Sequence, residues 1–141
     1  MAPPRAYSIF DKVEVIGYEQ GFLGSYYEAT VVSVLGDGRY QVLYKNLIED
    51  EETKIPIKEK LFPRVLRPRP PRVRTVEFKV GQNVDVFINE GWWIGKIVAV
   101  DIERSLYMVY FRSTNKITEY HSSSIRVHQD LIDGLWYQSG P

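Results

Sequence analysis

Histidine, serine and glycine are the residue types in this chain that could support catalysis or phosphate binding, but their spacing favours neither. His121 and His128 lie seven positions apart, and the 141 residues include no cysteine, so no zinc-binding pattern is present. The serine run at 122–124 follows His121, yet a catalytic triad is defined by spatial roles and not by adjacency in sequence. Gly36 and Gly38 lack the lysine and the following helix of a phosphate-binding loop. We predict that the chain is not an enzyme and needs no metal or other cofactor.

Aromatic side chains are the more informative feature, because the chain has ten tyrosines, six phenylalanines and three tryptophans. The face of an aromatic ring is electrostatically negative and attracts cations. A hydrophobic fraction of 44% is sufficient for a packed core and excludes wholesale disorder. No apolar run approaches the roughly 18 residues of a transmembrane helix, so we expect no membrane association.

The charge is balanced only as an average. The chain has 18 basic and 18 acidic residues, but residues 1–62, 63–75 and 76–141 carry charges of −3, +5 and −2. The middle segment, PRVLRPRPPRVRT, also holds four of the eight prolines. Proline fixes φ and favours extended geometry in the preceding residue. This segment therefore predicts a stiff, arginine-rich connector between two acidic modules.

The two flanks of the connector repeat one order of residues. VEV at 13–15, GFLGSYYEATVV at 21–32 and YQVLY at 40–44 correspond to VDV at 84–86, GWWIGKIV at 91–98 and YMVYF at 107–111. Valine, isoleucine and tyrosine recur at period two in these runs, which is typical of short strands. Four or five strands in about 60 residues predict a small, strongly bent barrel that is marginal alone. We therefore expect the two modules to pack together.

These strings resemble the Agenet branch of the Royal, or Tudor-like, family. GFLGSYYEATVV is similar to the Agenet pattern of a glycine-rich loop, paired aromatics and an Ala-x-Val-Val strand, and GWWIGKIV is similar to the same element of a second module. The resemblance covers roughly residues 7–68 and 76–130 and is closest to plant tandem-Agenet proteins that read histone H3 methylated at lysine 9. It implies an all-β fold of two SH3-like, five-stranded barrels packed as a tandem pair.

The resemblance also implies domain boundaries and a partner. We expect module 1 at 1–67, the connector at 68–75, module 2 at 76–130 and a C-terminal tail at 131–141. The tail is apolar enough to pack on module 2 or to begin a spacer toward further repeats. The implied partner is a histone H3 tail with a dimethylated or trimethylated lysine, which predicts a nuclear, chromatin-bound monomer.

Family members hold methylated lysine in an aromatic cage, whose rings come from the first strand's end or following loop, the start of the second strand and the end of the third. Carried over to module 1, which we favour, these positions are occupied by Tyr18 or Phe22, Tyr27 and Tyr44. In module 2 they are Phe87, Trp93 and Phe111, with Tyr110 as a substitute for a register slip of one. Any one of these rings could instead be a core or cross-strand packing residue.

Acidic residues near the cages would attract the basic part of such a tail. The run Glu49-Asp50-Glu51-Glu52 follows Tyr44 by a few positions, and Asp85, Glu90 and Glu103 could extend the same field from module 2. The alternative for the acidic run is an ordinary solvated loop.

Two other kinds of binding remain open. Arginine is suited to phosphate, so a nucleic acid could bind through Arg64, Arg67, Arg69, Arg72 and Arg74. These arginines could instead pair with the acids of the modules themselves. The other possibility is that the chain is a protein-interaction adaptor whose binding does not depend on methylation.

Overall fold

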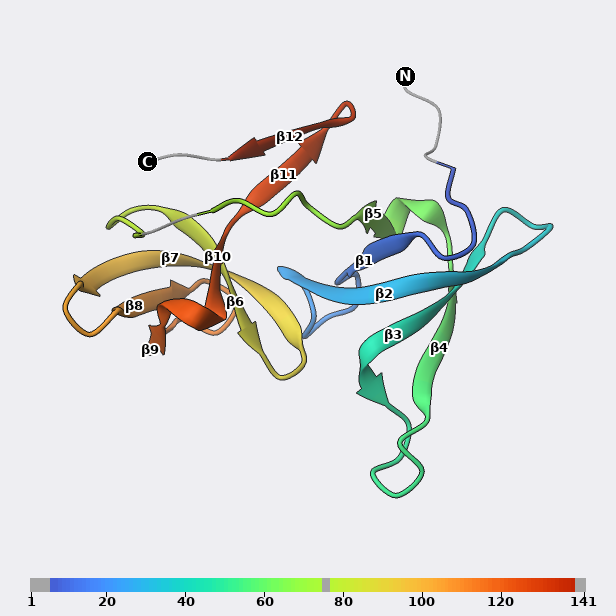
Figure 1. Cartoon of the computed structure of the whole chain (residues 1–141), viewed down its shortest axis with the longest axis horizontal. Helices are drawn as coiled ribbons and strands as arrows, with labels where there is room; N and C mark the ends of the chain where they lie inside the picture. The colour runs from blue at the N-terminus through green and yellow to red at the C-terminus, as the bar shows by residue number, and fades with distance from the viewer. Residues whose placement is uncertain (1–5, 75–76, 139–141) are drawn as a thin grey trace. The chain divides into compact units, whose positions relative to one another are not determined.

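The computed structural model describes residues 6–74 and 77–138, and the chain divides into two compact units, Met1–Arg69 and Pro70–Pro141. We call them unit 1 and unit 2 and describe each by itself (Figure 1). The outermost residues of the expected modules and tail, at 1–5 and 139–141, lie outside the described residues, as do residues 75 and 76 at the end of the connector. Within the part of the chain that the structure describes, no helix is long and apolar enough to cross a membrane.

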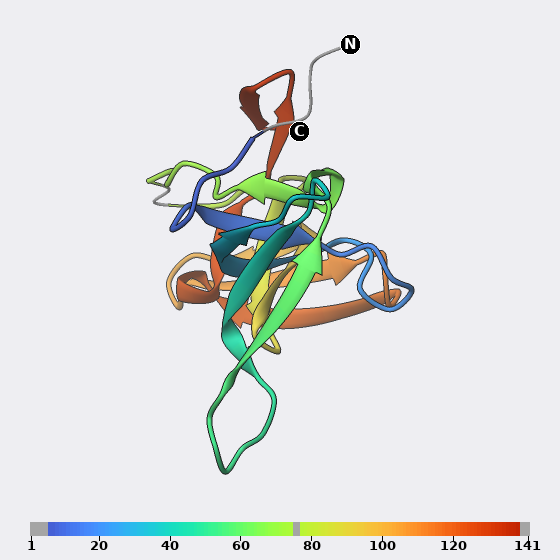
Figure 2. The ribbon, with the colours of Figure 1, turned by 90° about the vertical axis from the view of Figure 1, so that its right-hand side faces the viewer.

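Unit 1 is a single bent antiparallel sheet. Its elements are β1 (Lys12–Ile16), β2 (Ser25–Val34), β3 (Tyr40–Ile48), β4 (Pro56–Leu61), the 3₁₀ turn η1 (Pro63–Val65) and β5 (Leu66–Pro68). The strands pair in the order β5–β1–β2–β3–β4. The long loop between β3 and β4 extends beyond the end of the sheet (Figure 2).

Unit 2 repeats this topology. Its elements are β6 (Asn83–Ile88), β7 (Gly91–Asp101), β8 (Leu106–Phe111), β9 (Lys116–His121), η2 (Ser122–Ser124) and β10 (Ile125–Val127), followed by the hairpin β11 (Gln129–Ile132) and β12 (Leu135–Gln138). The first five strands pair in the order β10–β6–β7–β8–β9. The all-β fold with two five-stranded, SH3-like units is therefore confirmed. No pairing among the described residues joins β4 to β5 or β9 to β10, so each sheet is bent rather than fully closed.

The bend of each sheet is produced at the same place in the repeat. The register between β2 and β3 shifts between Val31 and Ser33, and the register between β7 and β8 shifts between Ile97 and Ala99. A bulge adds one residue to one strand and increases the local twist and bend. The β-branched run after the paired aromatics thus curls each long strand around its own core.

Each core is built by the alternation expected of a strand with one buried face. In unit 1 the inward residues of β2 and β3 include Val31 and Val42, both 0% exposed. The hydroxyl of Tyr40 accepts a hydrogen bond from the backbone N–H of Tyr7 at 3.1 Å, and in unit 2 the hydroxyl of Tyr107 accepts one from the N–H of Phe78 at 3.3 Å. Both tyrosines are buried, as expected for core positions.

A buried ion pair joins the first and last strands of each five-stranded sheet. Glu14 on β1 lies opposite Arg67 on β5, and Asp85 on β6 lies opposite Arg126 on β10. Both carboxylates are fully buried, with nitrogen–oxygen distances of 2.8 and 2.9 Å to their arginines. The expectation that Asp85 contacts a bound peptide is wrong, because the folded unit already encloses its carboxylate.

The C-terminal segment folds as the hairpin β11–β12. It begins two residues before the expected tail, at Gln129, whose side-chain amide donates to the backbone oxygen of Pro71 at 2.9 Å. The preceding His128 is buried, and its ring nitrogens lie 2.7 Å from Asp85 and 3.0 Å from Asp130. The hairpin is therefore attached to unit 2 by polar contacts at its base.

Candidate ligand-binding site

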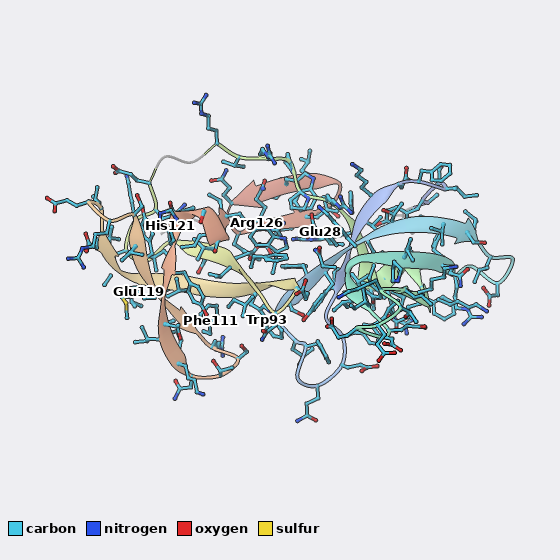
Figure 3. All side chains as sticks on the ribbon, turned by 60° about the horizontal axis from the view of Figure 1, so that its bottom comes forward. Glu28, Trp93, Phe111, Glu119, His121 and Arg126 are labelled. Carbon is cyan, nitrogen blue, oxygen red and sulfur yellow. The ribbon has the colours of Figure 1, made fainter. Side chains whose placement is uncertain are left out.

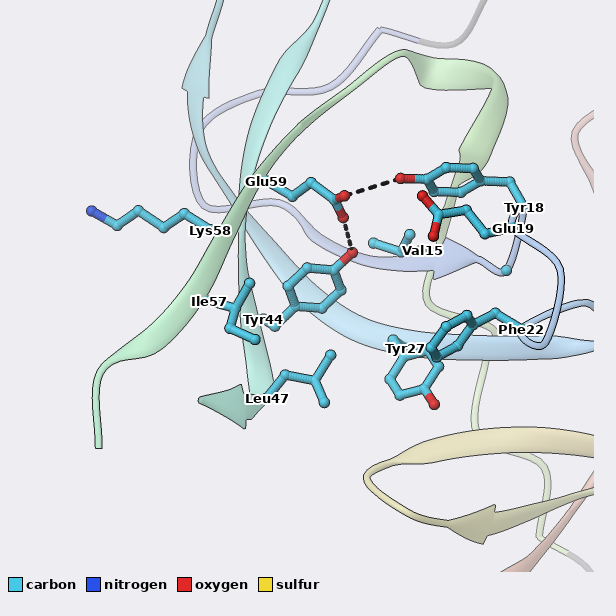
Figure 4. A pocket seen from close by; sticks show the side chains of 11 residues that line it. Val15, Tyr18, Glu19, Phe22, Tyr27, Tyr44, Leu47, Ile57, Lys58 and Glu59 are labelled. Atoms are coloured by element: carbon cyan, nitrogen blue, oxygen red, sulfur yellow. Dashed lines mark hydrogen bonds between the residues drawn. The ribbon is translucent and has the colours of Figure 1, made fainter. Parts of the chain in front are cut away.

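Unit 1 contains an open pocket of about 400 Å³ where the β1–β2 loop meets β2, β3 and β4 (Figure 4). The residues that line it are Val15, Gly17, Tyr18, Glu19, Phe22, Tyr27, Tyr44, Leu47, Ile57, Lys58 and Glu59. All four rings that the sequence suggested for module 1 are among them. The pocket thus combines aromatic and aliphatic walls with two carboxylates.

The four rings fall into an inner and an outer pair. Tyr27 and Tyr44 are on inward positions of β2 and β3, and each is 7% exposed. Tyr18 and Phe22 come from the β1–β2 loop and are 44% and 47% exposed. Phe22 stands edge-on to Tyr27, with ring centroids 6.1 Å apart and an interplanar angle of 66°. The sheet therefore supplies the floor of the pocket and the loop supplies its rim.

The β1–β2 loop is held in shape by a close backbone approach. The N–H of Gly17 donates to the backbone oxygen of Ser25 at 2.9 Å, and the Ser25 hydroxyl donates to the backbone oxygen of Phe22. A Cβ atom at Gly17 would lie 1.8 Å from that Phe22 oxygen, so only glycine fits. Gly21 and Gly24 have φ of +92° and +82°, a region that glycine enters without strain. These glycines let the loop return to β2 with Tyr18 and Phe22 at the pocket.

Glu59 links the two sides of the pocket through the tyrosine hydroxyls. The Tyr18 hydroxyl donates to Oε2 of Glu59 at 3.0 Å, and the Tyr44 hydroxyl donates to Oε1 at 2.5 Å (Figure 4). Burial and the bond to this carboxylate raise the pKa of Tyr18 to about 12, and the same causes raise the pKa of Tyr44 well above its usual value. Both hydroxyls therefore stay protonated, and both act as donors to Glu59.

The carboxylate of Glu59 has no cationic partner among the residues that the structure describes. Lys58 is its neighbour on β4, but that side chain points away from the pocket (Figure 4). Glu19 adds a second, solvent-exposed carboxylate at the rim. Because a half-buried carboxylate without a counter-ion is costly, the site is electrostatically complementary to a cation. Neither carboxylate was singled out from the sequence.

The acidic run does not line the pocket. Glu49, Asp50, Glu51 and Glu52 are exposed in the loop after β3, which starts beyond the pocket residue Leu47. Glu51 forms an exposed ion pair with Lys54 at 3.0 Å. The loop can therefore act on a ligand at longer range, through its charge, more readily than by contact inside the pocket.

The residues of the second candidate cage do not all come together, because Phe87 is separated from Trp93 and Phe111. Phe87 packs edge-on against Trp92, with ring centroids 5.1 Å apart. Phe111 belongs to the buried core of unit 2 and Trp93 packs against that core; both are labelled in Figure 3. Phe111 is 5% exposed, and the Trp93 indole N–H donates to the Ile88 backbone oxygen. Tyr110 donates to Asn115. The expected cage in module 2 is therefore not assembled.

Two local differences distinguish unit 2 from the part of unit 1 that forms the pocket. The β6–β7 turn consists of Asn89 and Glu90, so there is no long loop to carry outer rings. In the β8–β9 pair, Thr118 lies opposite Val109, where Glu59 lies opposite Val42 in unit 1. Glu90 is exposed in that tight turn, with φ of 71°.

The connector arginines are partly used by unit 1 itself. Arg67 is buried against Glu14, and Arg69 donates to the backbone oxygens of Val13 and Ala29. Arg64 lies over the Phe62 ring, 5.3 Å from its centroid. Arg72 and Arg74 remain exposed. The expected nucleic-acid surface is thereby reduced to two or three arginines. Among the described residues, no group of three or more acidic or histidine side chains is arranged to hold a metal.

The fold and the pocket define a pair of SH3-like modules, one of which has a pocket lined by aromatic rings and two carboxylates. A family model described as the Agenet domain matches residues 11–71. The crystal structure of Arabidopsis thaliana AGDP1 AGD34 superposes with a TM-score of 0.85 and 31% identity, over 94% of this chain and 89% of that one. The crystal structure of ADCP1 tandem Agenet domain 3-4 superposes with a TM-score of 0.81 and 30% identity, over 94% of this chain and 87% of that one. The chain belongs to the Agenet domain family and is a binding module rather than an enzyme.

Similar sequences occur within longer proteins. The Arabidopsis thaliana protein Agenet domain-containing P1 is 34% identical over 124 residues, which is 88% of this chain and 24% of that protein. The Arabidopsis thaliana DUF724 domain-containing protein 3 is 30% identical over 132 residues, 89% of this chain and 19% of that protein. The chain thus spans a quarter or less of the length of these relatives.

Proposed function

We propose that unit 1 is a reader of a methylated lysine on a histone H3 tail, with dimethylated or trimethylated lysine 9 as the preferred mark. The observation that carries the proposal is the convergence of Tyr18, Phe22, Tyr27 and Tyr44 with an unpaired carboxylate in one pocket. A methylated lysine keeps its positive charge and gains apolar methyl groups. Aromatic walls accept the methyls, while ring faces and Glu59 attract the charge.

The expected affinity is compatible with a transient chromatin contact. Each ring contributes roughly 0.5–2 kcal/mol to holding a cation, depending on how well it is desolvated. Three or four rings then supply a few kcal/mol, whereas micromolar binding requires about 8 kcal/mol. The remainder must come from peptide residues outside the pocket. The exposed acidic loop at 49–52 is a source of such help, because histone tails are rich in lysine and arginine.

Unit 1 is the module to which we assign the site. Its rim needs the eight-residue loop between β1 and β2, and unit 2 has a two-residue turn at that place. We propose that unit 2 supports the tandem without its own methyl-lysine cage. Action on a histone tail places the protein at chromatin in the nucleus.

The proposal is tested by calorimetric titration of the full chain with histone H3 tail peptides that differ only in methylation at lysine 9. Tyr18→Ala and Phe22→Ala are the informative variants, because these exposed rings can be removed without opening a core cavity. Phe62→Ala is the matched control, since that ring is 43% exposed in unit 1 but does not line the pocket. We expect the first two variants to weaken binding of the methylated peptide about tenfold or more, and the control to bind normally.

Equal affinity for the unmethylated and methylated peptides would contradict the proposal and favour a methylation-independent adaptor. Binding of a DNA or RNA duplex that falls steeply with salt and is lost in Arg72→Ala and Arg74→Ala would favour nucleic acid instead. These two arginines are exposed, so their removal leaves unit 1 intact.

A further inference from the structure

We propose that unit 1 binds the phosphate backbone of duplex DNA through a basic corner on the outer face of its sheet. The basic corner consists of four cationic side chains around the ring of Phe62, namely Arg39, Lys58, Lys60 and Arg64. It goes beyond the proposed function, because the corner and the pocket lie on different faces of β4.

The alternation of β4 separates the two faces. Successive side chains of a strand point to opposite sides of the sheet. Glu59 and Leu61 are on the inward side, whereas Lys58 and Lys60 are exposed on the outer side, roughly 7 Å apart. The backbone is still extended at Phe62, with φ of −76° and ψ of 151°, so its ring continues the outer series and is 43% exposed.

Two further elements bring an arginine to the same ring. Tyr40, the first residue of β3, lies opposite Leu61, so Arg39 comes next to Phe62. The guanidinium carbon of Arg39 is 6.0 Å from the centroid of the Phe62 ring, and that of Arg64, from η1, is 5.3 Å away. Contact with an aromatic ring attracts each guanidinium. Phe62 therefore holds two long, flexible cations close together before any ligand arrives.

Most of the charge at the corner is available to a ligand. In the part of the chain that the structure describes, Lys58, Lys60 and Arg64 form no ion pair. Arg39 pairs with Asp37 at 2.7 Å, and both side chains remain partly exposed. The residues opposite the two lysines on β3 are uncharged. Four cations and one acid thus leave the corner with three positive charges.

The acidic loop at 49–52 does not cancel this charge. The loop lies beyond the other end of β4, where the β3–β4 connection extends away from the sheet (Figure 2). The six residues of β4 span roughly 20 Å, which is more than two Debye lengths at physiological salt. Unit 1 therefore presents an acidic end and a basic end that act separately.

The chemistry of the corner favours the backbone of a duplex over a single strand. Lysine and arginine bind phosphate, and such contacts supply most of the affinity of sequence-independent DNA binding. Proteins that bind single strands stack successive bases on several aromatic side chains. The corner has one exposed ring, and two guanidinium groups already contact it. Histone octamers are wrapped by duplex DNA, so this ligand is close to any histone tail that the pocket binds.

The test is a fluorescence-anisotropy titration of a labelled DNA duplex of mixed sequence with the full chain, at salt concentrations from about 50 to 200 mM. The informative variant combines Lys60→Gln with Arg64→Gln, because both side chains are exposed and neither lines the pocket. We expect it to weaken duplex binding about tenfold or more at the lowest salt. The slope of log K against log salt should become shallower by about two.

Two controls separate the corner from general charge. Lys96→Gln combined with Lys116→Gln removes the same charge from exposed positions of unit 2 and should leave duplex binding within about twofold of the unaltered chain. Phe62→Ala removes no charge, so it should weaken binding about two- to fivefold, the range of an exposed cation–aromatic contact, with the salt slope unchanged. The Lys60→Gln, Arg64→Gln variant should still bind the methylated histone peptide, which shows that the two sites are independent.

Three results would overturn the inference. The first is a duplex affinity that is the same in the Lys60→Gln, Arg64→Gln variant as in the unaltered chain, including the case in which neither binds. The second is a loss confined to Arg72→Ala and Arg74→Ala, which would assign the duplex to the connector. The third is tighter binding of a single strand of the same length. None of them bears on the pocket, whose function is tested separately by the methylated peptide.

Discussion

Arg67 on β5 forms a buried ion pair with Glu14 on β1, and its guanidinium carbon lies 3.5 Å from the ring centroid of Tyr26 on β2. Unit 2 repeats the arrangement with Arg126, Asp85 and the Trp92 ring, at 4.3 Å. In both units the arginine thus joins the first, second and last strands of the sheet. The ring positions are those of the paired aromatics in the repeated sequence, which gives the first aromatic of each pair a structural role.

Arg67→Ala should destabilise unit 1 by about 3–5 kcal/mol, because it leaves the Glu14 carboxylate buried without its partner. Peptide-resolved hydrogen exchange under native conditions measures this change in unit 1 directly. Arg64→Ala is the matched control, since Arg64 is exposed and should change the stability by no more than about 0.5 kcal/mol. A loss below about 1 kcal/mol in Arg67→Ala would contradict the importance of the pair.

Gly17→Ala should reduce the free energy of binding of the methylated peptide by more than it reduces the free energy of unfolding. The added Cβ would meet the Phe22 oxygen and the Ser25 Oγ, so the loop that carries Tyr18 and Phe22 must move. Gly36→Ala is the control, because nothing lies within 4 Å of the new methyl group and its φ is not in the left-handed region. The test is a titration of Gly17→Ala and Gly36→Ala with the same methylated peptide. Equal affinities of the two variants would show that the geometry of the β1–β2 loop is unimportant for binding.

His128 should make the stability of unit 2 depend on pH. Burial opposes its charged form, but hydrogen bonds and charge attraction from Asp85 and Asp130 raise its pKa above the ordinary value. A raised pKa in the folded state means that the stabilisation is fully present below the unfolded-state pKa of about 6.5 and is lost as pH rises through the folded-state value. Arg126, the other charged group on Asp85, stays protonated throughout.

This pH dependence can be measured by urea unfolding followed by tryptophan fluorescence, because all three tryptophans, at 92, 93 and 136, are in unit 2. The free energy of unfolding should fall as the pH rises above about 6.5, and His128→Gln should lack this decrease. An identical pH slope in the variant would assign the effect to other groups.

Neutralising the acidic loop should reduce affinity only at low ionic strength. Replacing Glu49, Asp50, Glu51 and Glu52 by their amides removes exposed charges that do not line the pocket. Such charges act at long range and are screened within about 8 Å at physiological salt. Titrations at two salt concentrations should therefore show a difference from the unaltered chain that disappears at high salt. A loss that persists at high salt would instead indicate direct contact with the peptide.

The architecture could be read from the sequence because its signals are local and occur twice. Period-two alternation in YQVLY and YMVYF marks the same inward faces that the structure buries, and the duplicated order of motifs predicts two units. Tyr27 and Tyr44 could be placed at the pocket for the same reason. Each lies at the end of an inward-facing series on its strand.

The roles of Glu59 and Asp85 could not be predicted from local sequence patterns. Glu59 lies in KIPIKEKL, and its inward position follows only when Ile57 and Leu61 are recognised as its neighbours on one face. From the sequence, Asp85 was expected to be available for contact with a bound peptide. Its partner Arg126 is 41 residues away, and this pairing cannot be inferred from spacing. The equivalent triplets VEV and VDV carry one common signal, an acid between two buried valines, that points to a structural ion pair.

The central claim is that the pocket recognises a methylated ammonium group through its charge. The most direct test is a titration that compares a trimethyl-lysine peptide with its neutral isostere, in which a tert-butyl carbon replaces the nitrogen. The two side chains have nearly the same shape and apolar surface, so the comparison isolates attraction to the rings and to Glu59. The account predicts that the neutral peptide binds at least about tenfold more weakly. Equal affinity for the two peptides would contradict it.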